Sequence, residues 1–517
     1  MNSDFEISDE ELDPCDQTNV LFEENDDIEV DERNDPTQQS WTSGPHIPIV
    51  YEFDEFQSGV TTNNLTANSR ELCFFEHFLN LEIMNEIVIE TNKFYLFKKS
   101  QTSHRPKSRI HKWINTTVPE MYIFFAVSML ITRNKHMTIE EHWSTHPYLE
   151  NPIFRKIMSR DRYQLLLQML HFSDPYVINS SRDKLIKIRT LLQYTRKFFK
   201  ETMIPYKNLC IDESIVVFKG RLMFKQYMPS KRHRFGIKMF VLCDVTTNYI
   251  LDFIIYCGEG TDIVDSHNIG VSGAVVSTLL NDYLGKGHTL WCDNWYSSPV
   301  LFKYLHDEHT NACGTVRKNR KGMPNFKKLK KGESESKKNG PLLALKWCDR
   351  RDVHMLTTLH SDSFEDAGKV DFKSGELIKK PSCIIQYNKN MGAVDKTDMM
   401  LSGLSCMRKS LKWYKKVSFH IIDLFLLNAH CIYTSITGSK KTLAEFQLCV
   451  IQQLVEKYKK HINPLSCSKP STSRHDFRIL PKSATDHFPE LIQQKGTSKK
   501  PRMRCHVCGN SKTEKKV

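Results

Sequence analysis

The spacing of apolar residues divides the chain into helical and strand-forming regions. Between residues 69 and 205, apolar side chains recur every three or four positions, as they do on the buried face of a helix. Thr117 and Glu120 form a candidate capping box in front of the apolar run 121–131. A second helical pattern runs from 406 to 462. Both segments are therefore predicted to be helical.

Between these segments the pattern changes to short runs rich in β-branched and aromatic residues. Two of these runs, within 240–257, are predicted to form a hairpin that turns at Thr247 and Asn248. A helical stretch at 272–284 follows, and strands then return. Strands that alternate with helices indicate an α/β layer. This layer is assigned to residues 206–316 and 381–405.

Segments poor in apolar residues mark the predicted domain boundaries. Residues 1–68 are acidic and polar and are expected to be disordered. A basic segment at 317–380 separates the two parts of the α/β layer, and its first part, 317–338, holds ten Lys or Arg against two Glu. Residues 463–503 form a predicted basic linker, and residues 504–517 a cysteine-containing end.

Charge is distributed unevenly along the 517 residues. The formal net charge is +13, but residues 1–40 hold 15 acidic residues and one Arg, so the remaining residues carry +27. An acidic segment next to a basic domain is common in proteins that bind nucleic acid. The alternative is a solvated acidic tail and an ordinary soluble surface, which would have the same composition. Residues 219–238 hold seven Lys or Arg and no acid. They form either a phosphate-binding track or a basic strand edge.

Cysteine usage and hydropathy indicate the cellular compartment and whether the chain enters a membrane. The 15 cysteines are scattered, and the start of the chain lacks a signal-peptide pattern. The apolar run 121–132 is too short to span a bilayer, and the run 417–433 is interrupted by polar residues. An intracellular protein with mostly free thiols and no membrane association is expected.

Three aspartates are the candidate catalytic residues. Asp244 and Asp293 each end an apolar strand, and Asp395 lies in a helical stretch with Asp398 three residues later. Clustered carboxylates repel one another and persist mainly where a cation neutralises them, which suits Mg²⁺ or Mn²⁺ acting on phosphate. The alternative is that an aspartate at a strand end only forms a turn. The pair Asp212-Glu213 is interpreted as lying before the first core strand, outside the site.

Several ordered motifs resemble those of piggyBac-family transposases. The resemblance covers about residues 70–510, and its motifs look closest to those of the transposable element-derived protein 4 group. The matching segments are 142–174, 211–221, 225–238, 292–298, 314–324, 387–402, 408–416 and 487–492.

The resemblance implies a fold and an activity. The fold is an RNase H-like α/β catalytic core, a mixed sheet flanked by helices, with 317–380 as a basic insertion domain and an all-α domain for DNA binding and dimerisation. The family's catalytic aspartates match Asp244, Asp293 and Asp395, and the acid at Asp398 is also required. Such enzymes use Mg²⁺ to cleave double-stranded DNA at transposon terminal repeats, form a hairpin and integrate at TTAA. A nuclear homodimer is implied.

Six residues are predicted to contact DNA. Arg317, Lys318, Arg320 and Lys321 follow a strand directly, so they can hold phosphates in a fixed register. A solvated loop face is the alternative. The other two residues are Asn294 and Trp413. Asn294, next to Asp293, either orients a phosphate or only closes the turn. The Trp413 ring either stacks on an unpaired base or packs in the core.

The last segment contains half of a possible zinc site. Cys505 and Cys508 form a CxxC pair, whereas structural Zn²⁺ needs four ligands. Family members carry a cysteine-rich zinc-binding domain there, so the pair is interpreted as the start of a truncated domain.

Three functions fit the sequence. The first is a cut-and-paste transposase, and the second is a domesticated, catalytically silent DNA-binding protein. A structure-specific nuclease would use the same acids but would not explain the motifs along the rest of the chain.

Overall fold

The computed structural model describes residues 41–101, 105–106, 108–178, 182–228, 234–264, 268–370, 375, 377–406, 410 and 412–461. All of these belong to the first of two contact-defined units, Met1–Cys467. The predictions for residues 1–40, for the linker and for Cys505 and Cys508 lie outside the described residues.

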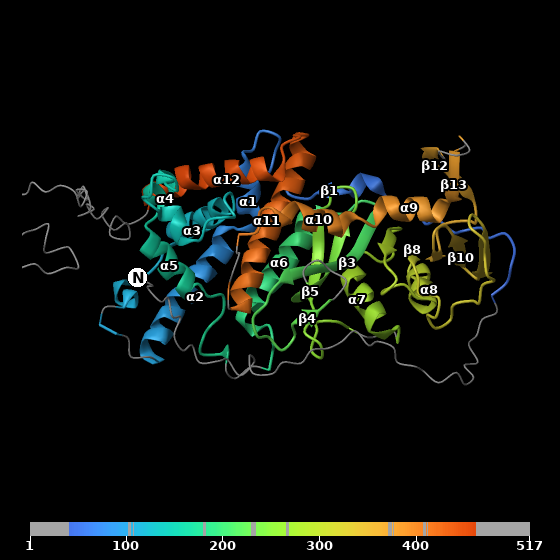
Figure 1. Ribbon diagram of the computed structural model, residues 1–517, viewed down its shortest axis with the longest axis horizontal. Helices are drawn as coiled ribbons and strands as arrows, with labels where there is room; N and C mark the ends of the chain where they lie inside the picture. Colours follow the sequence, from blue (N-terminus) through green and yellow to red (C-terminus); the bar gives the residue numbers. More distant parts are fainter. Residues whose placement is uncertain are drawn as a thin grey trace, which may run out of the picture. The chain divides into compact units, whose positions relative to one another are not determined.

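The described residues form one nine-stranded sheet at the centre of this unit (Figure 1). Strand β3 pairs antiparallel with β5 and parallel with β7, which in turn pairs parallel with β8. The expected hairpin is confirmed, because β5 and β6 pair antiparallel around Asn248, whose φ is 61°. In spatial order the strands are β4 (Gln226–Tyr227), β5 (Phe235–Asp244), β3 (Asn208–Val217), β7 (Thr289–Cys292), β8 (Asn311–Thr315), β11 (Asp352–Thr357), β10 (Leu342–Cys348) and β9 (Ser334–Asn339), with β6 (Ile250–Ile255) also beside β5.

Helices cover the two faces of the sheet. On one face, α6 (Arg189–Thr202) is held by Arg196, whose guanidinium donates to the fully buried Asp252 of β6 at 2.6 and 2.9 Å. On the other face, α10 (Ala393–Ser402) packs against β3 and β5. Strands buried on both sides are mainly apolar, and β5 and β6 fit this pattern apart from the buried charges of Lys238, Asp244 and Asp252. Helix α7 (Gly270–Leu280) also packs on β6, and α8 (Pro299–Asp307) packs on β8.

Helices from both ends of the described chain pack together, as the resemblance implied. Helix α1 contacts α11, and α3 contacts α12 (Figure 1). The rings of Tyr122 and Tyr458 stack at 4.4 Å, and the Leu72 amide donates to Gln453 at 3.1 Å. The helices are α1 (Glu71–Phe78), α2 (Leu81–Gln101), α3 (Val118–Ile131), α4 (Pro152–Ile157), α5 (Arg160–Met169), α11 (Trp413–Thr437) and α12 (Leu443–Tyr458).

Helix α11 links this helical layer to the sheet. Asn428 donates to the Ile250 carbonyl and accepts from the Ile250 amide, both at 2.9 Å, so its side chain pairs with β6 in the manner of a neighbouring strand. Among the described residues, α11 is the one helix long and apolar enough to cross a membrane, and 78% of its apolar window is buried inside the protein.

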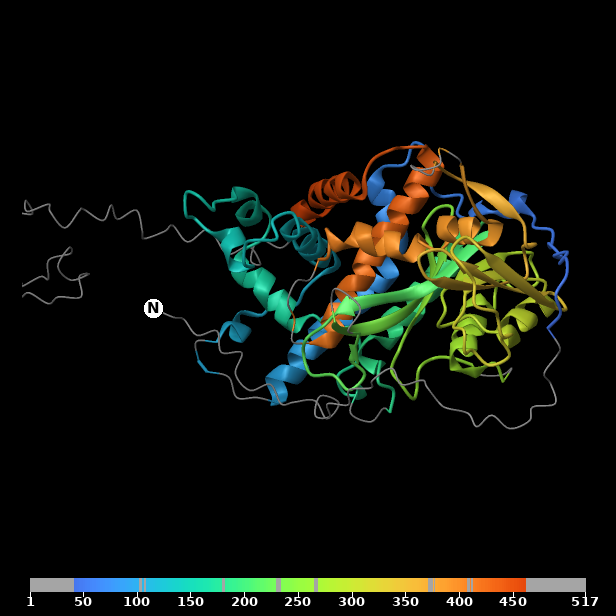
Figure 2. The ribbon, with the colours of Figure 1, turned by 45° about the vertical axis from the view of Figure 1, so that its right-hand side comes forward.

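The basic segment 317–380 is not separate from the core. Its strand β11 pairs antiparallel with β8, and β10 and β9 extend the same sheet (Figure 2). These strands of the predicted insertion therefore continue the core sheet. Beyond them, β12 (Phe364–Val370) and β13 (Leu377–Pro381) form a two-stranded sheet that leads into α9 (Ser382–Asn390).

Residues 41–68 are ordered against the core, so the predicted disorder up to residue 68 is wrong for this part. The Trp41 indole donates to the Gly322 carbonyl at 2.8 Å, and Thr42 exchanges two backbone hydrogen bonds with Lys338 of β9. Further along, β1 (Gly59–Val60) pairs with β2 (Met203–Ile204).

The predicted capping box at α3 does not form. Thr117 caps α3 without a side-chain hydrogen bond. Glu120 instead accepts from Arg162 at 2.8 and 2.6 Å and from Thr116 at 2.9 Å, and the Glu120 and Arg162 side chains are 4% and 6% exposed. A buried ion pair thus joins α3 to α5.

Replacing Arg162 with Met should lower the free energy of unfolding by about 3–5 kcal/mol, because Glu120 would be left as a buried charge without its cation. Urea denaturation measures the change. The matched control is Lys197→Met, which breaks the exposed Lys197–Glu201 pair (3.9 Å) and should cost about 0.5 kcal/mol or less. Similar losses for both variants would contradict this account.

Candidate functional site

The pairing of β3 with β7 brings two aspartates together. The parallel register runs from Asn208–Thr289 to Ile211–Cys292 and ends there. Asp212 and Asp293 are the next residues on the two chains. The carboxylates of Asp212, Glu213 and Asp293 each place one oxygen within 4.8 Å of the others. All three side chains are partly buried.

A third aspartate approaches from α10. Asp395 lies in the first turn of this helix, and its charge acts on Asp212 together with those of Glu213 and Asp293. The pKa of Asp212 is raised to about 7, mainly by burial and in addition by the charges of the three neighbouring carboxylates, against a hydrogen bond from the Glu213 amide that lowers it. Burial, followed by the Glu213 charge, also raises the pKa of Asp293, which the Trp295 and Tyr296 amides partly oppose.

Two side chains of β3 attach α10 to the sheet. Ser214 Oγ donates to Asp398 Oδ1 at 2.6 Å, and Cys210 Sγ donates to the Met391 carbonyl at 3.1 Å. Because side chains alternate along a strand, Cys210, Asp212 and Ser214 share one face. Asp398, one turn after Asp395, therefore anchors the helix beside Asp212.

The predicted placement of Asp244 beside Asp293 is wrong. Asp244 pairs with Leu209 of β3, so it lies about three residues, roughly 10 Å, along the sheet from the level of Asp212 and on the opposite face. Its buried carboxylate accepts from the Tyr206 amide at 2.8 Å and from the Thr247 amide and hydroxyl, both at 2.7 Å. Asp244 is thus a turn former, the alternative that its position at a strand end also allowed.

Sequence reasoning missed Asp212 because it placed the residue before the first core strand. Asp212 lies in the middle of β3, the strand between β5 and β7. The available signal was the apolar run on both sides of it, Leu209 to Ile211 and Ile215 to Val217. An acidic pair inside such a run places charges in a buried strand, which costs free energy unless a cation or hydrogen bonds compensate them.

The predicted DNA-binding residues border the loop after Asp293. Arg317 and Lys318 are exposed, and Arg317 Nε donates to Asn294 Oδ1 at 3.5 Å. The Arg320 guanidinium donates to the carbonyls of Asn294 and Trp295, both at 2.7 Å, so it supports this loop. DNA contact by these residues and by Lys321 stays a prediction.

Trp413 occupies the protein interior rather than a surface. Its side chain is 5% exposed and meets the Phe224 ring edge-on, with ring centroids 5.2 Å apart. Core packing, the second of the two interpretations considered for this residue, describes its position. The expected stacking of this ring on a base does not fit the conformation seen.

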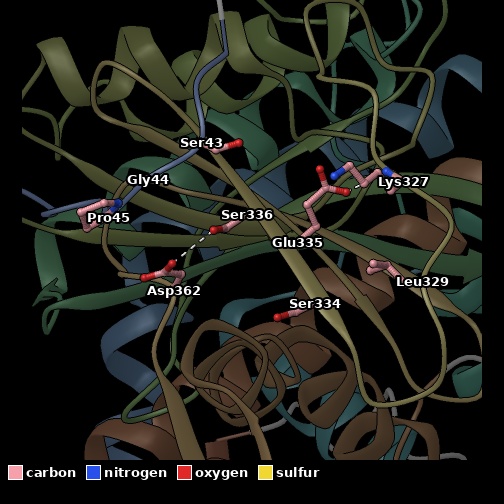
Figure 3. Close-up of a pocket in the computed structure, with 9 residues that line it drawn as sticks. All are labelled: Ser43, Gly44, Pro45, Lys327, Leu329, Ser334, Glu335, Ser336 and Asp362. Carbon is pink, nitrogen blue, oxygen red and sulfur yellow. Dashed lines mark hydrogen bonds between the residues drawn. The ribbon is translucent and has the colours of Figure 1, made fainter.

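A hollow of about 560 Å³ lies elsewhere on the sheet (Figure 3). It opens between residues 43–45 and β9, which is four strand positions from β7, or roughly 19 Å. Asp362 accepts there from Ser336 at 3.2 Å, and Glu335 accepts from the Lys327 amide at 2.7 Å. These carboxylates have partners of their own, and the hollow is separate from the aspartate cluster.

Comparison with known proteins identifies relatives along most of the chain. A family model described as Transposase IS4 matches residues 71–430. The human PiggyBac transposable element-derived protein 2 is 23% identical over 419 residues, which are 76% of this chain and 64% of that protein. The human PiggyBac transposable element-derived protein 3 is 23% identical over 386 residues, 72% of this chain and 63% of that protein. The chain spans less than two thirds of the length of these curated relatives.

A solved structure shares the fold. The cryo-EM structure of a piggyBac transposase synaptic complex with hairpin DNA superimposes with a TM-score of 0.68 at 25% identity, covering 81% of this chain and 86% of the other. The mixed sheet flanked by helices is thus an RNase H-like core. Because the family model matches well over half of its residues, the chain belongs to the DDE-type transposase family that includes piggyBac and its element-derived relatives.

Proposed function

We propose that the chain is a metal-dependent DNA transposase of the cut-and-paste type, with Asp212, Asp293 and Asp395 as its catalytic carboxylates. The observation that carries the proposal is the convergence of Asp212 and Asp293 at the end of the β3–β7 pairing, with α10 bringing Asp395 beside them. Asp212 thus replaces Asp244 in the triad expected from sequence.

The donor set fits a divalent cation. Membership of the family implies dependence on a divalent metal. Partly buried carboxylates with one oxygen each within 4.8 Å repel one another. Burial first, and then the charges of the neighbouring carboxylates, raise the pKa of Asp212 and of Asp293, so both charged forms are destabilised without a cation. Hard oxygen ligands of this kind suit Mg²⁺ or Mn²⁺. When bound, such an ion supplies a stronger oxygen nucleophile and stabilises a leaving 3′-oxygen.

The surrounding residues would orient this site. The Trp295 amide donates to Asp293 Oδ1 at 2.9 Å and limits the rotation of that carboxylate. Asp398, held by Ser214, would keep Asp395 facing Asp212. Arg317 and Lys318, exposed beside the Asp293 loop, would hold DNA phosphates next to the carboxylates.

The finer steps rest on resemblance. We infer nicking at terminal repeats, a hairpin intermediate and integration at TTAA by a nuclear homodimer. The similar solved structure is described as a synaptic complex with hairpin DNA, which supports the hairpin and the DNA partner. The names of the curated relatives, element-derived proteins, support the alternative of a domesticated DNA-binding protein. Salt-dependent DNA binding without cleavage would favour that alternative.

Asp212→Asn should reduce strand cleavage by about 100-fold or more, the scale on which preorganised charge stabilisation acts in active sites. Cleavage is measured with Mn²⁺ on duplexes that carry candidate inverted repeats taken from the genomic sequence on either side of the gene. Asp293→Ala should lose cleavage equally while retaining DNA binding.

Asp244→Asn is the matched control for this experiment. It should lower stability by about 1–3 kcal/mol, because one of the hydrogen bonds to Tyr206 and Thr247 is lost. Its folded fraction should still cleave at a rate near that of the wild type. Loss of cleavage in Asp244→Asn, with retention in Asp212→Asn, would reverse the assignment.

Lys318→Ala should weaken DNA binding by a similar factor for all sequences and lower the slope of log K against log salt by about 0.9, as expected for one lost phosphate contact. Fluorescence anisotropy across a salt series measures both quantities. The control is Lys286→Ala. Lys286 is exposed and precedes β7, so it lies at the opposite end of this strand from Asp293. An unchanged slope in Lys318→Ala would remove this residue from the interface.

A further inference from the structure

A buried ion pair lies against the aspartate cluster and has no role in the function proposed above. Lys238 Nζ is 3.1 Å from Glu213 Oε1, and the two side chains are 6% and 13% exposed. In the antiparallel register Glu213 faces Phe240, and Lys238 faces Ile215. The lysine and the glutamate are therefore diagonal neighbours on the same face of the sheet.

The Lys238 ammonium also lies close to two aromatic rings. It is 4.7 Å from the centroid of Trp295 and 5.0 Å from that of Phe240, and these rings stack at 5.3 Å with an angle of 16°. Ring faces attract a cation, and they attract it more strongly when water is excluded. The position of the ammonium is thus set by Glu213 and by both rings.

The same contacts connect the ion pair to Asp293. The Trp295 ring meets Lys238, and the Trp295 amide donates to Asp293 Oδ1 at 2.9 Å. Glu213 has an oxygen within 4.8 Å of oxygens of Asp212 and Asp293, close enough to join them around a cation. Glu213 therefore has two possible cationic partners, the lysine and a metal ion.

We propose that Lys238 is a positioning residue of this site, which binds Glu213 and keeps that carboxylate out of the metal coordination sphere. The inference rests on the proposed function for the identity of the three aspartate ligands. Strand alternation agrees with it, because Glu213 emerges on the face of Lys238 and Asp212 emerges on the face of α10. The ion pair contributes no net charge, so the metal ion would be coordinated by the three aspartates and not also by Glu213.

The test is Mn²⁺ binding by the full chain, followed by the EPR signal of the free ion. Lys238→Met keeps an apolar stem on the rings but releases Glu213, so Mn²⁺ should bind about tenfold more tightly, as expected for one added nearby charge. The double variant Glu213→Gln/Lys238→Met should return to within about threefold of the wild type. Lys238→Arg, which keeps the charge, should also bind Mn²⁺ as the wild type does. A lysine that served only packing would leave Mn²⁺ binding unchanged or weaker on removal, not tighter.

Two results would overturn the inference. One is unchanged or weaker Mn²⁺ binding by folded Lys238→Met, with folding checked by the thermal unfolding midpoint. The other is loss of Mn²⁺ binding in Glu213→Gln to the extent seen in Asp293→Asn, because Glu213 would then be a ligand. If Lys238→Met does not fold, the comparison of Mn²⁺ binding between Glu213→Gln and Asp293→Asn still tests the inference.

The experiment separates this inference from the proposed function. Should the Mn²⁺ affinities follow the expected pattern while the wild type cleaves no DNA, Lys238 stands as a positioning residue and the catalytic proposal fails. Cleavage by the wild type with unchanged Mn²⁺ affinity in Lys238→Met would retain the transposase and reject the role of Lys238. A wild-type chain that binds no Mn²⁺ would reject both.

Discussion

The arrangement of the site depends on the opposite directions of the two strands beside β3. Strand β5 runs against β3, and β7 runs with it. The carboxyl ends of β5 and β7 therefore lie at opposite ends of the strands. An aspartate that ends β5 cannot reach an aspartate that follows β7. Asp293 meets Asp212 inside β3 instead, whereas Asp244 closes the hairpin into β6. The pairing direction thus separates the carboxylates proposed as catalytic from Asp244, which closes a turn.

The sequence predicted features that are encoded locally. Apolar periodicity located the helices on both sides of the sheet, and Thr247-Asn248 predicted the hairpin, because turn residues and helix faces depend on near neighbours. Strand direction depends on partners far along the chain, so the sequence placed Asp244 in the site and left Asp212 out. Glu120 shows the same limit, because its spacing from Thr117 matches a cap, but Arg162, 42 residues later, binds it.

Three of the clustered carboxylates are held by groups from different parts of the chain. Ser214 of β3 binds Asp398 of α10, the Trp295 amide binds Asp293, and Lys238 of β5 binds Glu213. Such contacts restrain side chains that would otherwise move apart under mutual repulsion. The motif around Asp395 predicted an acid on a helix, but the residues that orient the acids were not recognisable as a group, since they lie far apart in the sequence.

The N-terminal segment has a consequence for the far edge of the sheet. Strand β9 is the outermost strand, and Thr42 occupies the backbone amide and carbonyl of Lys338 before the chain turns away at Gly44, whose φ of 131° is accessible mainly to glycine. An edge strand with free backbone groups is a template for any extended chain that approaches it. Thr42 therefore blocks strand addition at this point of β9, and a chain shortened past it would leave the Lys338 backbone groups open to another chain while the aspartate cluster stayed intact.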